Sequence, residues 1–325
     1  MAVKQSGNAN LHKARKARQD EFYTRIEDVE AELWHYREHF RGKTVYLNCD
    51  DPRYSAFWRY FCLRFGELGL EKLIATHYTG VTEPGQPSFK IEALRGRDDT
   101  AGDGIKYVDP ETGGVRTALD GDGDFRSDEC VELLKQSDIV VTNPPFSLFR
   151  EYVAQLVEYN KKFVIIGNMN AITYKEIWPL IQDSRLWLGV QSPKRFIVGD
   201  TMPDKAGQTI NQLGKREQAF GNILWFTNLD HAKRHEELPL WKCYTPEEYP
   251  KYDEVGAINV DKVKEIPQDY DGAMGVPITF LDKWNPEQFE IVGLDRYWEC
   301  NPHSGRRFHV GGREVYARIL IRKVM

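Results

Sequence analysis

The stretch from Asp138 to Phe146, which reads DIVVTNPPF, constrains the fold more than any other part of the sequence. Ile139 to Thr142 are apolar or β-branched, and such a short run predicts a buried strand. A polar amide, two prolines and an aromatic residue follow at once. The pattern therefore predicts a strand that delivers chemical groups at its tip, as strands of open α/β sheets do.

The tip has the groups needed to hold an aromatic amine. Asn143 offers a side-chain carbonyl, and Pro144 has no N–H, which leaves the local backbone rigid and rich in acceptors. The two carbonyls can accept both hydrogens of the amine, and Phe146 can stack on the ring that carries it. The structural alternative is a strand, a Pro-Pro stop and a core phenylalanine, but packing rarely needs an asparagine at this position.

Length and composition set the class of protein. A chain of 325 residues can form one large α/β domain with a smaller one appended. It is 29% charged and contains no apolar run near 18 residues and no signal sequence, so we expect a cytoplasmic protein without membrane contact. The five cysteines are scattered and odd in number, which indicates reduced thiols.

Basic residues gather at both ends of a chain whose net charge is −5. A polyanion responds to the distribution of charge, so these ends favour double-stranded DNA as a partner, but only weakly, because a run of charge is usually just a solvated surface. We read residues 1–20 as a flexible basic arm. The candidate DNA contacts in the two ends are Lys13, Arg15, Lys16, Arg306 and Arg307.

Strands alternate with helical patterns up to residue 229. Thr44–Asn48, Leu73–Tyr78 and Phe163–Gly167 are strand candidates beside the central one, which predicts a doubly wound sheet. Residues 80–123 are too long for a simple crossover and predict an inserted hairpin. Ser127 and Ser147 are predicted helix N-caps.

Two segments are candidates for DNA contact. The polar stretch Gln191–Gly221 exceeds the usual loop length, which indicates either a functional loop or secondary structure that the pattern does not reveal. We favour a DNA-contacting loop carrying Lys194 and Arg195 over a plain surface excursion. Beyond residue 230 the alternation of strands and helices fades, so residues 230–325 are predicted to recognise the target. Phe196, Trp225 and Phe226 are aromatic, but core packing is the stronger interpretation.

No pattern predicts a metal site. A calcium loop starting at Asp120 would need glycine and glutamate where Phe125 and Val131 stand. His231 and His235 are four residues apart but lack the glutamate of a zinc hydrolase, and we expect both on the surface of a helix.

Several motifs together resemble one known family. The tetrapeptide Asn143-Pro144-Pro145-Phe146 resembles the catalytic signature of amino-methyltransferases that depend on S-adenosylmethionine (SAM). With EFYT at residues 21–24, YLNCDDPR at 46–53 and GVPITFLDKWNPEQFEIVG at 275–293, the chain resembles the EcoRI-type adenine-specific DNA methyltransferases from near Leu11 to its end. The resemblance implies a Rossmann-like catalytic domain over residues 21–229 and a target-recognition region over 230–325.

The resemblance also implies a cofactor site. Phe22, Tyr23 and Thr24 are expected to wall the SAM pocket, although a hydrophobic staple at a helix entry explains them as well. After the first strand, Asp50-Asp51-Pro52-Arg53 replaces the usual glycine-rich loop. Cys49, Asp50 and Asp51 are expected to contact the cofactor, and the sequence leaves open which aspartate faces it. In Gly123-Asp124-Phe125 the acid is expected to receive the adenine amine of SAM, and the aromatic ring to stack on it. Asn143 completes the list of expected cofactor contacts.

The implied activity is methyl transfer from SAM to the N6 amine of an adenine flipped out of duplex DNA. It would be the modification half of a restriction-modification system, possibly at GAATTC, with a nuclease partner that it need not contact. An enzyme that methylates one adenine at a time needs only one copy of the chain, so we expect a monomer. An RNA or protein-glutamine methyltransferase and a non-catalytic DNA-binding module are the alternatives.

Overall fold

The computed structural model describes residues 22–79, 87–102, 105–198, 207–211, 214–298 and 307–324. The chain forms two compact units. The first comprises residues 1–169 and 191–229, and the second comprises 170–190 and 230–325. The chain thus passes to the second unit at Asp230, where we placed the start of the recognition region, but residues 170–190 also belong to that second unit.

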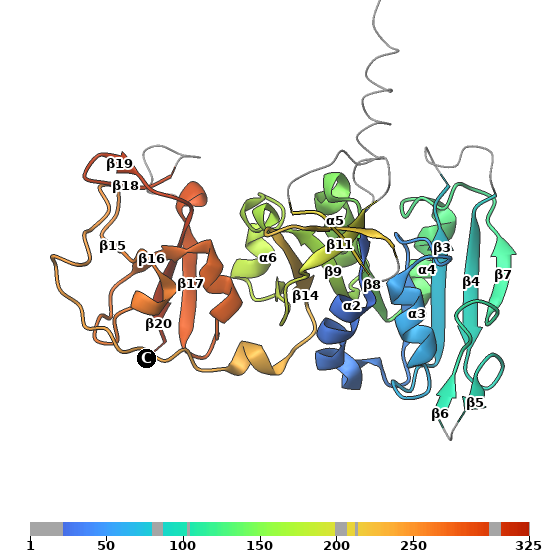
Figure 1. The fold of residues 1–325 in the computed structure, drawn as a ribbon. Coiled ribbons are helices and arrows are strands. Elements are labelled where there is room, and N and C mark those ends of the chain that lie inside the picture. Colours follow the sequence, from blue (N-terminus) through green and yellow to red (C-terminus); the bar gives the residue numbers. More distant parts are fainter. Residues whose placement is uncertain are drawn as a thin grey trace, which may run out of the picture. The chain divides into compact units, whose positions relative to one another are not determined.

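The first unit is built on a large mixed sheet (Figure 1). Its strands are β2 (Thr44–Leu47), β3 (Lys72–His77), β4 (Phe89–Leu94), β7 (Val115–Ala118), β8 (Ile139–Thr142), β9 (Lys162–Asn168) and β14 (Ile223–Thr227). They lie in the order β14-β9-β8-β2-β3-β4-β7. The four central strands are parallel, whereas β14, β4 and β7 run antiparallel to their neighbours. The predicted α/β class is confirmed, with a mixed sheet.

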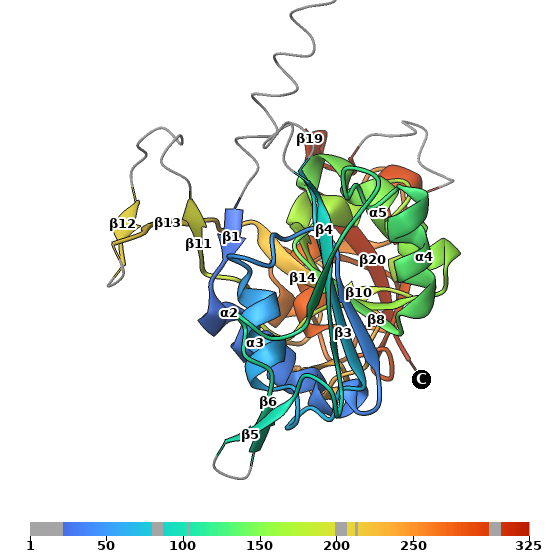
Figure 2. The same ribbon diagram turned by 90° about the vertical axis from the view of Figure 1, so that its right-hand side faces the viewer.

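Helices cover both faces of this sheet. Figure 2 shows α2 (Ile26–Leu33) and α3 (Ala56–Leu63) on one face, with α4 (Asp128–Gln136) and α5 (Phe149–Glu158) on the other. The 3₁₀ helices η1 (Trp34–Phe40) and η2 (Phe146–Leu148) continue α2 and precede α5. Alternate residues of β2 are buried on opposite faces of the sheet. Val45 and Leu47 join the cluster on the α2 and α3 face, whereas Tyr46 between them is buried but does not belong to that cluster.

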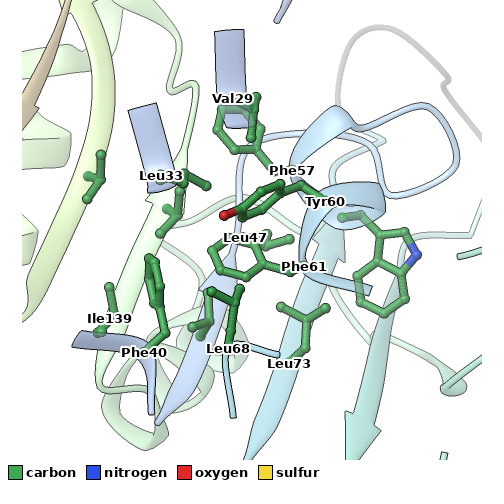
Figure 3. Close-up of a cluster of buried hydrophobic side chains, with 14 of the residues drawn as sticks. Val29, Leu33, Phe40, Leu47, Phe57, Tyr60, Phe61, Leu68, Leu73 and Ile139 are labelled. Carbon is green, nitrogen blue, oxygen red and sulfur yellow. The ribbon is translucent and has the colours of Figure 1, made fainter. Parts of the chain in front are cut away.

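That cluster is the core beneath the site (Figure 3). Phe40, Phe57 and Phe61 are fully buried in it, and the rings of Phe40 and Phe61 meet edge to face at 5.1 Å. Side chains from α2, α3, β2, β3 and β8 interlock there, so the strands that carry the polar tips are held from behind by tightly packed apolar groups.

The region predicted as an insertion extends the sheet. β4 pairs with β3 and β7, and β5 (Thr100–Gly102) and β6 (Ile105–Tyr107) form a separate hairpin. Backbone hydrogen bonds join the hairpin to α3 and to the turn after it: the Val108 N–H donates to the Cys62 carbonyl of α3, and the Gly66 N–H donates to the Lys106 carbonyl, both at 2.9 Å. An antiparallel hairpin was the expectation here, and the described part of the region contains one.

The segment expected as a long polar loop contains strands. β11 (Arg195–Val198), β12 (Thr209–Ile210) and β13 (Arg216–Ala219) form a small antiparallel sheet with β1 (Phe22–Thr24), in the order β1-β11-β13-β12. These residues therefore contain the secondary structure that the length of the segment left open, and they do not form a loop. Two short strands far apart in sequence, β1 and β11, satisfy each other's backbone groups.

The second unit contains a smaller sheet in the order β15-β16-β20-β17. These strands are β15 (Ile258–Asn259), β16 (Met274–Pro277), β17 (Phe289–Leu294) and β20 (Arg318–Lys323). The unit also contains α6 (Trp178–Gln182), β10 (Trp187–Leu188), the hairpin of β18 (His309–Val310) and β19 (Arg313–Glu314), and the 3₁₀ helices η4 (Ala232–His235), η5 (Val263–Glu265), η6 (Ile278–Lys283) and η7 (Asp295–Tyr297). The 3₁₀ helix η3 (Met169–Thr173) lies at the boundary between the units.

Candidate active site

The predicted catalytic corner follows β8. All four residues of β8 are buried, and the strand is paired in parallel with β2 and β9 on its two sides. Asn143 is half-buried with a buried side-chain oxygen, Pro144 is buried, and Pro145 and Phe146 are half-buried. Phe146 packs against the large core cluster and keeps part of its ring exposed. The corner thus presents one amide and one aromatic ring at the carboxyl end of a rigid strand.

Ser147 does not cap the helix that follows. The chain first makes η2, and α5 begins at Phe149 with Leu148 in the N-cap position and no side-chain capping bond. The prediction of an N-cap at Ser147 is therefore wrong, because the two prolines start a 3₁₀ turn that shifts the helix by one step. Ser127 does cap α4, since its hydroxyl accepts from the Cys130 N–H at 3.3 Å.

The two aspartates after β2 have different surroundings. Asp51 is held in a turn, because its carboxylate accepts from the Arg53 Nε at 3.0 Å and from Nη2 at 2.6 Å. Asp50 is buried beside Ser55. Burial raises the pKa of Asp50 to about 7, against the lowering effect of the Ser55 hydrogen bond and with a further rise from the Asp51 charge.

Cys49 lies just before these acids and is half-buried, with its Sγ 3.6 Å from the Oδ1 of Asn48. Burial raises the pKa of its thiol, and the nearby Cys130, Asp124 and Asp50 raise it further. The thiol is therefore protonated at neutral pH and acts as a weak hydrogen-bond donor rather than a nucleophile.

The end of β3 meets this loop. His77 is buried, with its Nε2 at 2.9 Å from Arg53 Nη2 and its ring 4.9 Å from that of Phe89. Gly123 lies against the same strand end at a φ of +81°, and a Cβ there would come within 2.3 Å of the His77 carbonyl oxygen. Only glycine fits this close approach, so the residue before Asp124 is fixed by packing as well as by conformation.

Asp124 and Phe125 follow in the same loop. The Asp124 carboxylate accepts from the N–H and the Nε of Arg126 at 2.9 and 2.8 Å. Although burial raises the pKa of Asp124, these hydrogen bonds hold it below its usual value, so the group is charged. Phe125 is buried, and its ring meets that of Tyr152 edge to face at 5.0 Å.

The structure thus brings the segments after β2 and β3 together with residues 123–125. The catalytic corner lies on β8, the direct neighbour of β2. Thr24 of β1 is paired with Phe196, which belongs to the core cluster against which Phe146 packs. Within the described residues, Phe22 and Tyr23 contribute backbone pairs with Val198 and Ile197.

The predicted DNA contacts are in several environments. Lys194 is exposed, but the Nη2 of Arg195 donates to the Thr209 Oγ1 at 2.6 Å, and its Nε lies 3.3 Å from Glu217. Arg307 is 3.8 Å from the buried Asp295. Lys13, Arg15, Lys16 and Arg306 lie outside the described residues.

The sequence interpretation missed Phe220 and correctly placed three other aromatic residues in the core. Phe220, directly after β13, is half-buried, packs against the same cluster as Phe146, and meets Phe196 at 5.7 Å. Its aromatic type was the only available signal. Phe196, Trp225 and Phe226 are buried, which confirms the core interpretation. His231 is buried and bonded to the Leu188 carbonyl, so the expectation that it lies on the surface is wrong.

The described residues contain neither a membrane-spanning helix nor a metal-binding cluster. No helix in the described ranges is long and apolar enough to cross a membrane. Among the same residues, no group of three or more His, Cys, Asp or Glu side chains is arranged to hold a metal ion.

A parallel-centred sheet with an Asn-Pro-Pro-Phe corner at a strand end, and acids at the neighbouring ends, is an arrangement suited to methylating an amine. Comparison with known proteins agrees: the family described as "Adenine-specific methyltransferase EcoRI" matches residues 10–323. The chain belongs to this family and is an adenine-specific DNA methyltransferase.

Its relatives match along nearly their whole length. The chain is 47% identical to the type II methyltransferase M.EcoRI of Escherichia coli, over 97% of this chain and 96% of the relative. It is 37% identical to M.MpnI of Mycoplasma pneumoniae and 35% identical to M.MgeORF184P of Mycoplasma genitalium, both type II methyltransferases, over 96% and 97% of this chain and 98% of each relative. The comparison with solved structures gave no significant match.

Proposed function

We propose that this enzyme transfers a methyl group from SAM to the N6 amine of an adenine that is rotated out of duplex DNA. The observation that supports this most is the corner after β8. It places the Asn143 amide, the Pro144 carbonyl and the half-exposed Phe146 ring at the end of one buried strand. Those are the groups needed to orient an amino nitrogen and to stack on the ring that bears it.

The residues at the neighbouring strand ends suit SAM. The cofactor carries an ammonium, a sulfonium and ribose hydroxyls, for which the carboxylates of Asp50 and Asp124 are suitable partners. Of the two aspartates after β2, Asp51 is bound by the Arg53 side chain and Asp50 is buried beside Ser55, so we assign the cofactor contact to Asp50 and the turn to Asp51. Asp124 would contact the cofactor while it keeps its bonds to Arg126. When bound, SAM would supply an activated methyl group.

The protein's part in the reaction is to position the amine. In the proposed complex the Asn143 Oδ1 and the Pro144 carbonyl accept the two amine hydrogens, so the nitrogen lone pair points away from the purine ring. The Asn143 oxygen is buried in this structure. Rotation of the amide about its terminal torsion exchanges Oδ1 and Nδ2 without moving the backbone, and this rotation is part of the proposal. No strong base is needed, because the proton can leave after methylation, and positioning supplies much of the rate.

The adenine must leave the base stack to reach this corner, at a cost of a few kcal/mol. Phe146 would stack on one face of the flipped base, and Phe220, which packs against the same cluster, is our candidate for the other face. The similarity to M.EcoRI supports GAATTC as the target, with its second adenine methylated, and a role as the modification half of a restriction-modification system.

Acceptor and site can be tested together. The purified protein is incubated with labelled SAM and with duplex DNA, RNA or protein acceptors, and the modified DNA is then read by single-molecule sequencing. We expect label only in duplex DNA, with N6-methyladenine in GAATTC. Label in RNA or protein would contradict the proposed substrate, and methylation at another sequence would contradict the proposed target alone.

A further inference from the structure

Tyr152 joins the segments that form the candidate cofactor site. It lies on α5, the helix that starts just after the catalytic corner, and its side chain is fully buried. Its hydroxyl donates to the Oδ1 of Asn48, the buried residue that immediately follows β2 and precedes Cys49. One side chain therefore links the corner's helix to the loop that carries Asp50.

The same helix also holds the loop with Phe125. The Tyr152 ring contacts the Phe125 ring with centroids 5.0 Å apart and planes at 77°. One turn further along α5, the Gln155 Nε2 donates to the Phe125 carbonyl at 3.1 Å. At the start of the helix, Glu151 lies 3.4 Å from Arg126. Three successive contacts thus fix residues 125–126 to α5.

Among the described residues, the Tyr152 hydroxyl has no strong substitute as a donor to Asn48. The other donor to that oxygen is the Cys49 thiol at 3.6 Å, and a thiol is a weak donor. Burial raises the pKa of Tyr152 well above its usual value, so the hydroxyl keeps its proton. Loss of this donor would leave a buried carbonyl with only the thiol, which is costly enough to disturb the loop.

We propose that Tyr152 is a positioning residue for the cofactor site. Its side chain holds the Asn48–Asp51 segment and Phe125 in fixed positions relative to the Asn143 corner. It acts from beneath the site and does not touch the reacting atoms. The inference rests on the proposed function, in which these two segments bind SAM. It predicts that the hydroxyl of Tyr152 matters for SAM affinity more than for the methyl-transfer step.

The test is Tyr152→Phe, which keeps the ring and its contact with Phe125 and removes only the donor. We expect the KM and the Kd for SAM to rise about tenfold, the equivalent of one lost hydrogen bond, with kcat at saturating SAM and KM for DNA within about twofold of wild type. The matched control is Tyr159→Phe at the end of the same helix, where the ring faces Lys135 instead. This control should leave the KM for SAM unchanged.

A double-mutant cycle with Asn48→Ala separates positioning from general stability. If the two side chains act through one hydrogen bond, the double variant should raise the Kd for SAM no more than Asn48→Ala alone, and additive effects would contradict the proposal. An unchanged Kd for SAM in a folded Tyr152→Phe variant would overturn it, even with a lower Tm. Should that variant fail to fold, Gln155→Met tests the same loop: a severalfold rise in the Kd for SAM supports the proposal, and none overturns it.

Wild-type measurements distinguish this inference from the proposed function. If wild-type protein binds no SAM in calorimetry, the proposed function itself fails. If it binds SAM and Tyr152→Phe binds equally well, only the role of Tyr152 fails.

Discussion

The two units place their buried polar groups in different positions. In the first unit Asn48, Asp50 and His77 lie just beyond or at the ends of parallel strands, beside half-exposed residues such as Asn143. In the second unit, Arg318 lies within β20, with its Nε donating to Asn259 at 3.1 Å and its backbone N–H to Asp295 at 3.2 Å. Under the proposed function the first set borders the cofactor site, whereas the second set binds partners within its own unit.

This difference distinguishes residues that we expect to act in binding or catalysis from residues that we expect to stabilise the fold. Polar side chains at the carboxyl ends of parallel strands converge on the ligand crevice of an α/β sheet. Polar side chains within a strand need partners from the protein itself, because water does not reach them. We therefore expect substitutions in the first set to change catalysis or binding more than stability, and substitutions in the second set to do the opposite.

The largest effect is expected at the catalytic corner. Asn143→Ala should lower the single-turnover rate of DNA methylation at least about 10²–10³-fold, because it removes an acceptor aimed at the reacting amine. Binding of SAM and DNA should largely survive. The control is Asn160→Gly in the turn between α5 and β9, where the φ of 51° suits glycine. Near-normal turnover of Asn143→Ala would remove this residue from the mechanism.

Asp50 gives a prediction that depends on pH. Its pKa in the folded protein is raised to about 7, so the folded state binds a proton that the unfolded state has released, and wild-type stability falls as the pH rises from about 4 to about 7. Asp50→Asn cannot titrate. It should be more stable than wild type at pH 8, by up to a few kcal/mol at about 1.4 kcal/mol per pKa unit, and little different at pH 4.

Urea unfolding of both proteins from pH 4 to 8 measures this difference. A stability difference that is the same at every pH would contradict the burial of a titrating Asp50. The same variant should bind SAM more weakly than wild type at pH 8. The charged Asp50 would then lower stability but support binding, unlike the buried polar groups of the second unit, which we expect to support stability alone.

In the second unit, Arg318→Met should lower the free energy of unfolding by roughly 1–3 kcal/mol, because it deprives the buried Asn259 of a charged donor. The single-turnover methylation rate at saturating SAM and DNA should stay near that of wild type. Arg322→Met, at an exposed position of the same strand, is the control and should change stability little. If Arg318→Met lost methylation activity but kept wild-type stability, the proposed difference between the two units would be wrong.

The smallest effect concerns DNA affinity. Lys194 is exposed and free to approach a phosphate, whereas the Arg195 guanidinium is bound to Thr209 and Glu217. Lys194→Ala should reduce the slope of log K for DNA against log salt by about one. Arg195→Met should leave that slope unchanged and lower stability instead. The reverse pattern, measured by fluorescence anisotropy across salt concentrations, would show that the small sheet opens on DNA.

Much of the first unit was predictable from sequence. The strands β2, β3, β8 and β9 are short runs of apolar and β-branched residues, and the predicted ranges agree with the structure within about two residues at each end. The polar residues at their ends were visible for the same reason. The N-cap at Ser127 follows from local chemistry, which sequence patterns capture well.

Long-range contacts were not predictable. Tyr152 and Asn48 are 104 residues apart in sequence. The local sequence does not distinguish a buried tyrosine whose hydroxyl bonds a distant residue from one that only packs in the core. The small sheet was missed because β1 and β11 are short and each is stabilised by a partner far away in sequence. Ser147 looked like an N-cap, but the Pro-Pro turn before it forms a 3₁₀ helix first.

The central claim is that Asn143 contacts the amine of the flipped adenine, and a cycle between protein and DNA tests it most directly. The affinity of wild type and of Asn143→Ala is measured, in the presence of the SAM analogue sinefungin, for duplexes that carry adenine or purine at the target position. Purine lacks the amine. We predict that the change to purine weakens binding by wild type about tenfold, and that it weakens binding by Asn143→Ala clearly less, because only the Pro144 carbonyl then remains to accept from the amine. An equal loss in both proteins would show that Asn143 does not hold the amine.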